Sequence, residues 1–210
     1  MTINKDLSLH THQLGKRYNR DWIFRNLSTS FEAGKTYAIT GPNGSGKSTL
    51  LQVLWGQLPP TEGSLEYKIE GTAVPVEDIY KEVSIATPYL DLIEEFTLLE
   101  ILDFHFKMRT LRNGLTLESI PELLELSHAQ HKTIGFFSSG MKQRLKLGLA
   151  LFTASNFVFL DEPFTNLDVN AITWYKRQLK HLEQSIVFIA SNEPKEYEGA
   201  NSIIRVNEIR

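Results

Sequence analysis

The stretch that decides the fold runs from Gly34 to Leu58 and reads GKTYAITGPNGSGKSTLLQVLWGQL. Its centre fits the pattern G-x-x-x-x-G-K-[ST], in which successive backbone N–H groups curl around phosphate oxygens. The candidate phosphate-binding residues are Gly41, Pro42, Asn43, Gly44, Ser45, Gly46, Lys47, Ser48 and Thr49. The glycines permit turn geometries that other residues resist. Lys47 is expected to reach the β- and γ-phosphates, and the Ser48 hydroxyl to bind Mg²⁺.

The residues on either side of this loop support a nucleotide-binding role. Thr36 to Thr40 is a short β-prone run that predicts a buried strand entering the loop. The helix expected after the loop has one apolar face, formed by Leu51, Leu54, Trp55 and Leu58. An ordinary glycine-rich turn is the alternative, but it does not require a strand before it and a helix after it. The sequence therefore predicts that this chain binds a nucleoside triphosphate.

Composition excludes several other classes of function. The chain has 210 residues, with 22 Lys+Arg against 25 Asp+Glu, and this charge balance does not favour nucleic acid as the main partner. It has no cysteine, which rules out disulfides and thiolate chemistry. The N-terminal MTINKDLSLHTH has no apolar segment of a signal peptide, and no apolar run approaches the ~20 residues that span a bilayer. We expect a soluble chain whose membrane role, if any, comes through a partner.

The N-terminal part reads as two antiparallel strands. Leu7 and Leu9 alternate with polar residues, Ile23 to Phe31 alternates in the same way, and Asn19 to Asp21 forms the polar turn between them. Tyr18 ends the first strand. Periodicity leaves two roles open for it: an aromatic ring that stacks on a base, or a half-buried strand residue.

The region after the P-loop helix is read less completely. Pro59 to Gly63 ends that helix sharply. Strands are expected at Ser64 to Ile69 and at Val83 to Ala86. Between these strands, the segment around Gly71 and Pro75 has no clear pattern and is expected to be irregular.

From Thr97 the pattern becomes helical. Thr97 to Glu100 is a capping box, and the apolar face that follows comprises Leu98, Ile101, Leu102, His105 and Met108. A second helix is expected from Ser119 to Glu122 onward, so that Tyr89 to Ser139 forms a helical insert. The insert carries His105, His128 and His131, which we interpret as packed or solvated side chains because carboxylate or cysteine partners at ligand spacing are missing.

A long helix is expected from Met141 to Phe152, after Ser138, Ser139 and Gly140, and three basic residues lie near its start. These are Lys142, Arg144 and Lys146. Basic residues are disfavoured near a helix N-terminus by the helix dipole. The two interpretations left open are a solvated helix face and an anion at the helix end that outweighs the repulsion.

Adjacent carboxylates follow an apolar run near residue 160. Phe157 to Leu160 is expected to be a parallel strand covered on both faces, and it leads into Asp161 and Glu162. Beside a P-loop, Asp161 would hold the water shell of Mg²⁺ and Glu162 would polarise an attacking water. The remaining elements are expected to be a helix at Ala171 to Leu182 and strands at Ile186 to Ala190 and Ser202 to Val206.

With these motifs in place, the chain resembles the nucleotide-binding subunits of ATP-binding-cassette (ABC) transporters. The resemblance covers nearly the whole sequence. It implies one α/β domain over residues 1–210, with a P-loop NTPase (RecA-like) core, an antiparallel β subdomain and a helical subdomain inserted at about 89–150. It also implies that Tyr18 stacks on adenine, and that Ser138, Ser139 and Gly140 are the signature residues that contact the ATP held by a second subunit. Asn166 to Asp168 looks like the loop that touches that subunit.

Two positions depart from the family pattern. The Gln expected where the central sheet meets the helical insert is replaced by Pro88, which has no side-chain donor or acceptor. The switch His expected after the strand at Ile186 to Ala190 is replaced by Asn192. An amide can still donate a hydrogen bond to a γ-phosphate, but it does not become cationic near neutral pH.

The resemblance implies an ATPase with Lys47, Glu162 and Asn192 in the catalytic set, ATP and Mg²⁺ as cofactors, and Ser48 and Asp161 at the metal. It implies a dimer with itself or with another cassette subunit, attached to a membrane-spanning partner at the cytoplasmic face, with no nucleic acid. Two alternatives stay open: a soluble cassette ATPase outside transport, and an ATP-binding regulatory subunit that hydrolyses little or nothing. Pro88 and Asn192 are the residues that make the second alternative plausible.

Overall fold

The computed structural model describes residues 6–209, so the start of the N-terminal segment lies outside the described residues. The strands are β1 (Ser8–Tyr18), β2 (Asp21–Glu32), β3 (Thr36–Thr40), β4 (Glu62–Ile69), β5 (Thr72–Val74), β6 (Val83–Ala86), β7 (Phe157–Asp161), β8 (Ile186–Ala190) and β9 (Ser202–Arg205). The α-helices are α1 (Lys47–Leu54), α2 (Leu98–Met108), α3 (Ile120–Leu123), α4 (Ser139–Phe152) and α5 (Val169–Leu179). The expected strands at Thr36–Thr40, Val83–Ala86 and Ile186–Ala190 are confirmed with those bounds.

The central sheet is parallel and has the strand order β6-β7-β8-β3-β9. All residues of β7 and β8 are buried, as expected for apolar strands covered on both faces. Because parallel strands end at one edge of their sheet, the segments that follow β3, β6, β7 and β8 meet there. These segments carry the P-loop, Pro88, Glu162 and Asn192, so the topology gathers the predicted catalytic residues at one edge.

The second sheet is antiparallel, in the order β2-β1-β4-β5. Its first two strands form the predicted hairpin, in which Tyr18 pairs with Asp21. The predicted alternation is confirmed, because Phe24, Leu27 and Phe31 are buried while polar residues between them are exposed.

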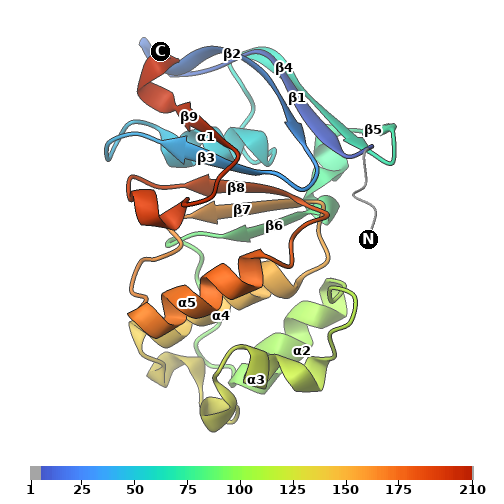
Figure 1. Cartoon of the computed structure of the whole chain (residues 1–210), viewed down its shortest axis with the longest axis vertical. Coiled ribbons are helices and arrows are strands. Elements are labelled where there is room, and N and C mark those ends of the chain that lie inside the picture. Colours follow the sequence, from blue (N-terminus) through green and yellow to red (C-terminus); the bar gives the residue numbers. More distant parts are fainter. Residues whose placement is uncertain (1–5, 210) are drawn as a thin grey trace.

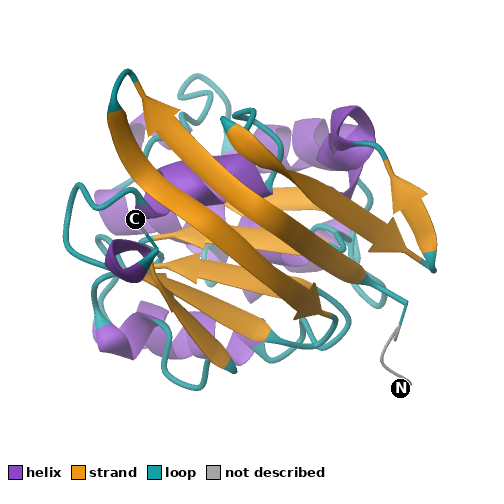
Figure 2. Ribbon diagram, turned by 90° about the horizontal axis from the view of Figure 1, so that it is seen from above, coloured by secondary structure: helices purple, strands orange, loops and turns teal. Residues whose placement is uncertain are grey.

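Helix α1 lies between the two sheets, and α4 and α5 cover the opposite face of the parallel sheet (Figure 1). Figure 2 looks onto the antiparallel sheet and shows its long strands crossing over the elements beneath. One apolar core fills the layer around α1, with Leu50, Leu51 and Leu54 fully buried in it. A second core lies between the parallel sheet and the helices of the insert. The division of the chain into a core and a helical subdomain at about 89–150 stays a prediction.

Several expectations about the middle of the chain need correction. Strand β5 forms a hairpin with β4 inside the segment that was expected to be irregular. The second helix of the insert is only four residues long. Met108 is not on the buried face of α2, because its side chain is 63% exposed. At this last turn, His105 and Arg109 line the interior instead.

Gly148, in the middle of α4, lies where the helix packs closely against Leu124. A Cβ at this position would lie 2.2 Å from Leu124 Cδ2, and Leu124 is fully buried. Gly148→Ala would gain helix propensity of about 1 kcal/mol, but overpacking a filled core costs about 1–3 kcal/mol. We expect a net loss in the free energy of unfolding, measured by urea denaturation. Gly135→Ala, whose Cβ would make ordinary contacts at 3.4 Å, is the control; an equally stable Gly148→Ala variant would contradict this packing.

Candidate nucleotide-binding site

The P-loop connects β3 to α1 at the edge where the parallel strands end. Gly41, Gly44 and Gly46 all have positive φ angles, of 150°, 75° and 104°. The loop is also closely packed, since a Cβ on Gly46 would lie 2.0 Å from Ile23 Cγ2 of the overlying hairpin. Gly41 and Gly46 are therefore required both for backbone conformation and for space, and Gly44 for backbone conformation.

The start of α1 is left open, unlike the starts of the longer helices. In α2, α4 and α5, the side chains of Thr97, Ser138 and Asp168 accept a hydrogen bond from a first-turn N–H group. The cap of α1 is Gly46, and within the described chain no side chain caps this helix. First-turn N–H groups without a protein partner attract anionic oxygens. This helix end suits a phosphate.

Lys47 lies folded back over the loop. Its side chain is only 5% exposed, and its Nζ donates to the carbonyl oxygens of Gly41 at 3.0 Å and Pro42 at 3.3 Å. Neutral carbonyls compensate a buried ammonium only in part. An anionic ligand in the loop would complete the neutralisation of this charge.

Asp161 is the last residue of β7 and lies beside Ser48 of the P-loop helix. It is 3% exposed, and its Oδ1 has no hydrogen-bond partner among the described residues. Burial raises the pKa of Asp161, and Glu162 adds to the rise, whereas a hydrogen bond with Ser48 and the charge of Lys47 lower it. A buried carboxylate oxygen without a partner, next to a hydroxyl, is a donor set of the kind that Mg²⁺ takes. The residues present therefore fit a magnesium ion.

Glu162 occupies a tight turn at the end of the same strand. Its φ angle is +46°, which is uncommon for a residue with a side chain. The Glu162 N–H group donates to the Ala190 carbonyl at 2.9 Å, so the turn is attached to the end of β8. The side chain is partly exposed, as a group that contacts water and substrate has to be.

The structure brings Asn192 to the P-loop. Asn192 follows β8, is exposed, and its Nδ2 lies 3.3 Å from Asn43 Oδ1. The loop after β6 has no equivalent contact from Pro88, whose carbonyl oxygen instead accepts a hydrogen bond from Lys146 at 2.8 Å. Of the two departures from the family pattern, only Asn192 therefore offers a polar side chain at the P-loop.

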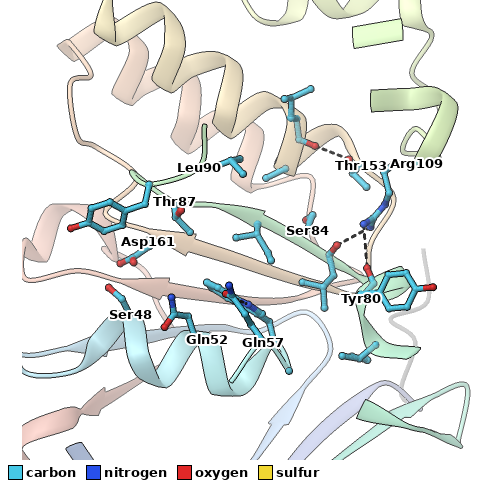
Figure 3. Close-up of a pocket in the computed structure, with 18 of the residues that line it drawn as sticks. Ser48, Gln52, Gln57, Tyr80, Ser84, Thr87, Leu90, Arg109, Thr153 and Asp161 are labelled. Carbon is cyan, nitrogen blue, oxygen red and sulfur yellow. Dashed lines mark hydrogen bonds between the residues drawn. The ribbon is translucent and has the colours of Figure 1, made fainter. Parts of the chain in front are cut away.

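A cavity of about 750 Å³ extends from this site between the core and the helical insert. In Figure 3, Ser48, Gln52 and Asp161 lie at one end, and Arg109 lies at the other, beside Tyr80 and Thr153. Gln52 was not predicted as a site residue. It is one helical turn after Ser48, a spacing that places both side chains on the same face of α1. Helical spacing from Ser48 was thus a signal that could have found it.

The remaining predicted residues lie on exposed surfaces. Tyr18 is 46% exposed, and Lys16 Nζ lies 5.4 Å from the centre of its ring. Ser138 and Ser139 are exposed at the start of α4, where the Ser138 hydroxyl accepts a hydrogen bond from the Met141 N–H group at 3.2 Å. A Cβ on Gly140 would lie 3.0 Å from the Asn166 carbonyl oxygen. The signature turn therefore packs closely against the loop that begins at Asn166.

The basic residues near the start of α4 have partners within the chain. Lys142 forms an ion pair with Glu94, Arg144 forms one with Glu125 at 2.6 Å, and Lys146 bonds to Pro88. The charges of Lys142 and Arg144 are therefore compensated by carboxylates within the chain, while Lys146 has a neutral carbonyl as its partner. The interpretation that an anion outweighs their repulsion loses its charge-based support; the exposed signature residues remain its only basis.

His105 predicts a pH dependence of stability. Thr153 Oγ1 donates to the Leu149 carbonyl at 2.6 Å, so it accepts from His105 Nε2 at 2.9 Å. Burial lowers the pKa of His105 from 6.5 to about 4, and Arg109 contributes to this, while a backbone hydrogen bond to Leu149 opposes it. The unfolded chain therefore binds more protons between these pKa values, and this contribution to stability, complete above pH 6.5, is lost as the pH falls toward 4.

His105→Gln keeps a donor toward Thr153 but does not titrate. We expect the free energy of unfolding to fall less steeply in this variant than in the native chain when urea denaturation is repeated from pH 7.5 down to about pH 4.5. His128→Gln, which changes an exposed histidine of the same insert, is the matched control. Parallel pH profiles for all three proteins would show that His105 is not buried in its neutral form.

The fold and the site define a P-loop nucleotide-binding protein with adjacent strand-end carboxylates. A family model described as "ABC transporter" matches residues 24–165, which is more than half of the chain. The chain therefore belongs to the ABC transporter family, as its sequence motifs predict, and it is an ATP-binding protein of that family.

Known proteins agree with this assignment. The cytochrome c biogenesis ATP-binding export protein CcmA of Reclinomonas americana is 32% identical over 199 residues, which cover 91% of this chain and 87% of that relative. The uncharacterized ABC transporter ATP-binding protein YcbN of Bacillus subtilis is 28% identical over 160 residues, 76% of this chain, and the match spans about half (52%) of that longer relative.

A solved structure of a putative ABC transporter ATP-binding protein from Pyrococcus furiosus has the same fold. It aligns with a TM-score of 0.81 at 20% identity, covering 96% of this chain and 98% of the other. No helix among residues 6–209 has the length and apolar character needed to cross a membrane.

Proposed function

We propose that this chain is the ATP-hydrolysing subunit of an ABC transporter and that it powers transport through a separate membrane-spanning partner. The observation that carries the proposal is the pairing of an open helix end over the P-loop with a buried, unpartnered Asp161 oxygen beside Ser48. The first feature suits phosphate and the second suits a divalent cation.

Each residue has a proposed role in this reaction. The P-loop N–H groups and Lys47 would hold the phosphates, and Ser48 and Asp161 would hold Mg²⁺. Mg²⁺ held there would supply positive charge that neutralises the charge developing on the phosphates. Glu162 would accept the proton of the attacking water, and Asn192 would orient toward the terminal phosphate from its position beside Asn43.

We also propose that two copies, or this chain and a related one, close over ATP. The P-loop of one subunit would face Ser138, Ser139 and Gly140 of the other, and Tyr18 would stack on the base. Exposed apolar side chains near these residues support such a contact: Phe136 is 74% exposed and Val169 is 78% exposed. The proposed location is the cytoplasmic face of a membrane, reached through the partner protein.

Phosphate release by the purified chain tests the proposal. Release that requires Mg²⁺ and stops when the metal is chelated is the expected result. ATP binding without any release, alone and with the co-purified partner, would favour the regulatory subunit. Isolation of the tagged chain from detergent-solubilised membranes tests the partner: a co-purifying membrane protein supports transport, whereas a soluble complex supports the other cassette ATPase.

A further inference from the structure

Glu196 is a buried carboxyl group that the proposed reaction does not use. It ends the 3₁₀ turn Pro194–Glu196, which follows β8, and it is only 6% exposed. Its Oε1 accepts a hydrogen bond from the Phe164 N–H group at 3.1 Å. Its Oε2 is buried and has no hydrogen-bond partner among residues 6–209. Glutamate is almost never fully buried unless it is paired, and here its partner is a backbone N–H group.

The turn that Glu196 contacts is the one that carries Glu162. This turn, residues 161–168, contains two residues other than glycine with positive φ angles, Glu162 at 46° and Asn166 at 62°. Such a conformation is costly and persists only where the surroundings enforce it. The hydrogen bond from Phe164 to Glu196 lies midway between the two.

The same turn is also hydrogen-bonded to α4. Gln143 is 5% exposed, and its Nε2 donates to the Pro163 carbonyl oxygen at 3.1 Å. Two consecutive residues of the turn, Pro163 and Phe164, are therefore hydrogen-bonded to side chains from two different segments of the chain. One of these side chains comes from the signature helix and the other from the segment that follows Asn192.

An aromatic pair lies beside Glu196, and several polar groups act on its carboxyl group. The Phe164 ring packs edge-on against the Tyr175 ring, with centroids 5.4 Å apart, and the Tyr175 hydroxyl is also buried without a partner in the described chain. Burial raises the pKa of Glu196, and Glu162 and Glu193 add to the rise, while the Ser191 hydroxyl and the Phe164 N–H lower it. The Glu196 carboxyl group is therefore buried although burial raises its pKa, and its hydrogen bond to Phe164 defines its position.

We propose that Glu196 is a positioning residue for hydrolysis: by accepting the Phe164 N–H it holds the turn that aims Glu162 and joins this turn to the loop that carries Asn192. Glu196 does not touch the nucleotide and acts only through these two residues. Because the turn places the group that takes a proton from water, a small displacement would slow the chemical step without weakening ATP binding.

The test compares Glu196→Met with Glu196→Gln. Both replacements have nearly the volume of glutamate, but only glutamine keeps an oxygen that accepts the Phe164 N–H. For Glu196→Met we expect kcat to fall about 10- to 100-fold, with the Kd for Mg-ATP within about 3-fold of native. Hydrogen–deuterium exchange should increase in the peptide that covers residues 161–168. Glu196→Gln should retain kcat within about 3-fold.

The matched control is Glu198→Met, which makes the same replacement two residues further on. Glu198 is exposed and paired with Lys176, so its variant should keep native kcat and native exchange at 161–168. A native kcat in Glu196→Met would overturn the proposal. So would a Glu196→Gln variant that binds ATP but loses kcat 10-fold or more, and this arm remains informative even if the methionine variant does not fold.

The inference rests on the proposed ATPase activity, and the two can fail separately. If the native chain releases no phosphate, the function fails and the exchange measurement alone decides for Glu196. If native hydrolysis depends on Glu162 and the Glu196 variants behave as the control does, only the positioning role fails.

Discussion

Lys47→Ala is expected to weaken the binding of Mg-ATP by at least about 30-fold. The Lys47 ammonium is nearly buried and donates hydrogen bonds to the carbonyl oxygens of Gly41 and Pro42. Its positive charge is placed to pair with the negative charge of the phosphates. Removing one partner of a buried, hydrogen-bonded charge pair costs about 2–5 kcal/mol. That loss corresponds to an affinity on the order of 30- to several thousand-fold weaker.

Calorimetric titration with ATP in the presence of magnesium measures this effect. Lys35→Ala is the control, because Lys35 is an exposed lysine at the start of the same region that forms an ion pair with Glu32. Native affinity in the control, together with a Kd at least about 30-fold higher in Lys47→Ala, is the expected pattern. An unchanged affinity in Lys47→Ala would mean that the nucleotide does not bind in the P-loop.

Glu162→Gln is expected to lower steady-state turnover by about 10²–10⁴-fold, because the replacement keeps the size of the side chain and removes its ability to take a proton. ATP binding should be retained, since Glu162 does not hold the phosphates in the proposed arrangement. Glu183→Gln, an exposed carboxylate far along the chain from the site, should turn over at the native rate. Equal rates in native protein and Glu162→Gln would remove Glu162 from the catalytic set.

The parts of the fold that sequence patterns predicted are those with local causes. The strands Thr36–Thr40 and Ile186–Ala190 are continuous apolar runs between turn residues, and both were predicted with the bounds they have. The capping box at Thr97 is present with both of its hydrogen bonds. The P-loop motif predicted its own conformation, because its glycines occupy backbone angles that few other residues tolerate.

What could not be predicted depends on contacts between distant segments. The sequence predicts Ser64–Ile69 and Val83–Ala86 simply as strands and does not indicate their partners. In the structure, β4 pairs with β1 and β6 pairs with β7. The basic residues of α4 suggested an anion, because their partners Glu94, Glu125 and the Pro88 carbonyl lie 19 to 58 residues away. Glu196 was not singled out, because neither its burial nor its bond to Phe164 has a signal in the local pattern.

The exposed signature residues and the P-loop are proposed to complete a nucleotide site only when two subunits meet. The most direct measurement is the mass of the Glu162→Gln variant in solution by light scattering, with and without Mg-ATP. One chain has a mass of 24.0 kDa. We predict that the variant doubles this mass when ATP is bound, and that Ser138→Arg, placed at the exposed signature, prevents the doubling. Two results together would contradict the shared site: the variant saturated with ATP has the mass of one chain, and it also stays monomeric when its membrane partner is added.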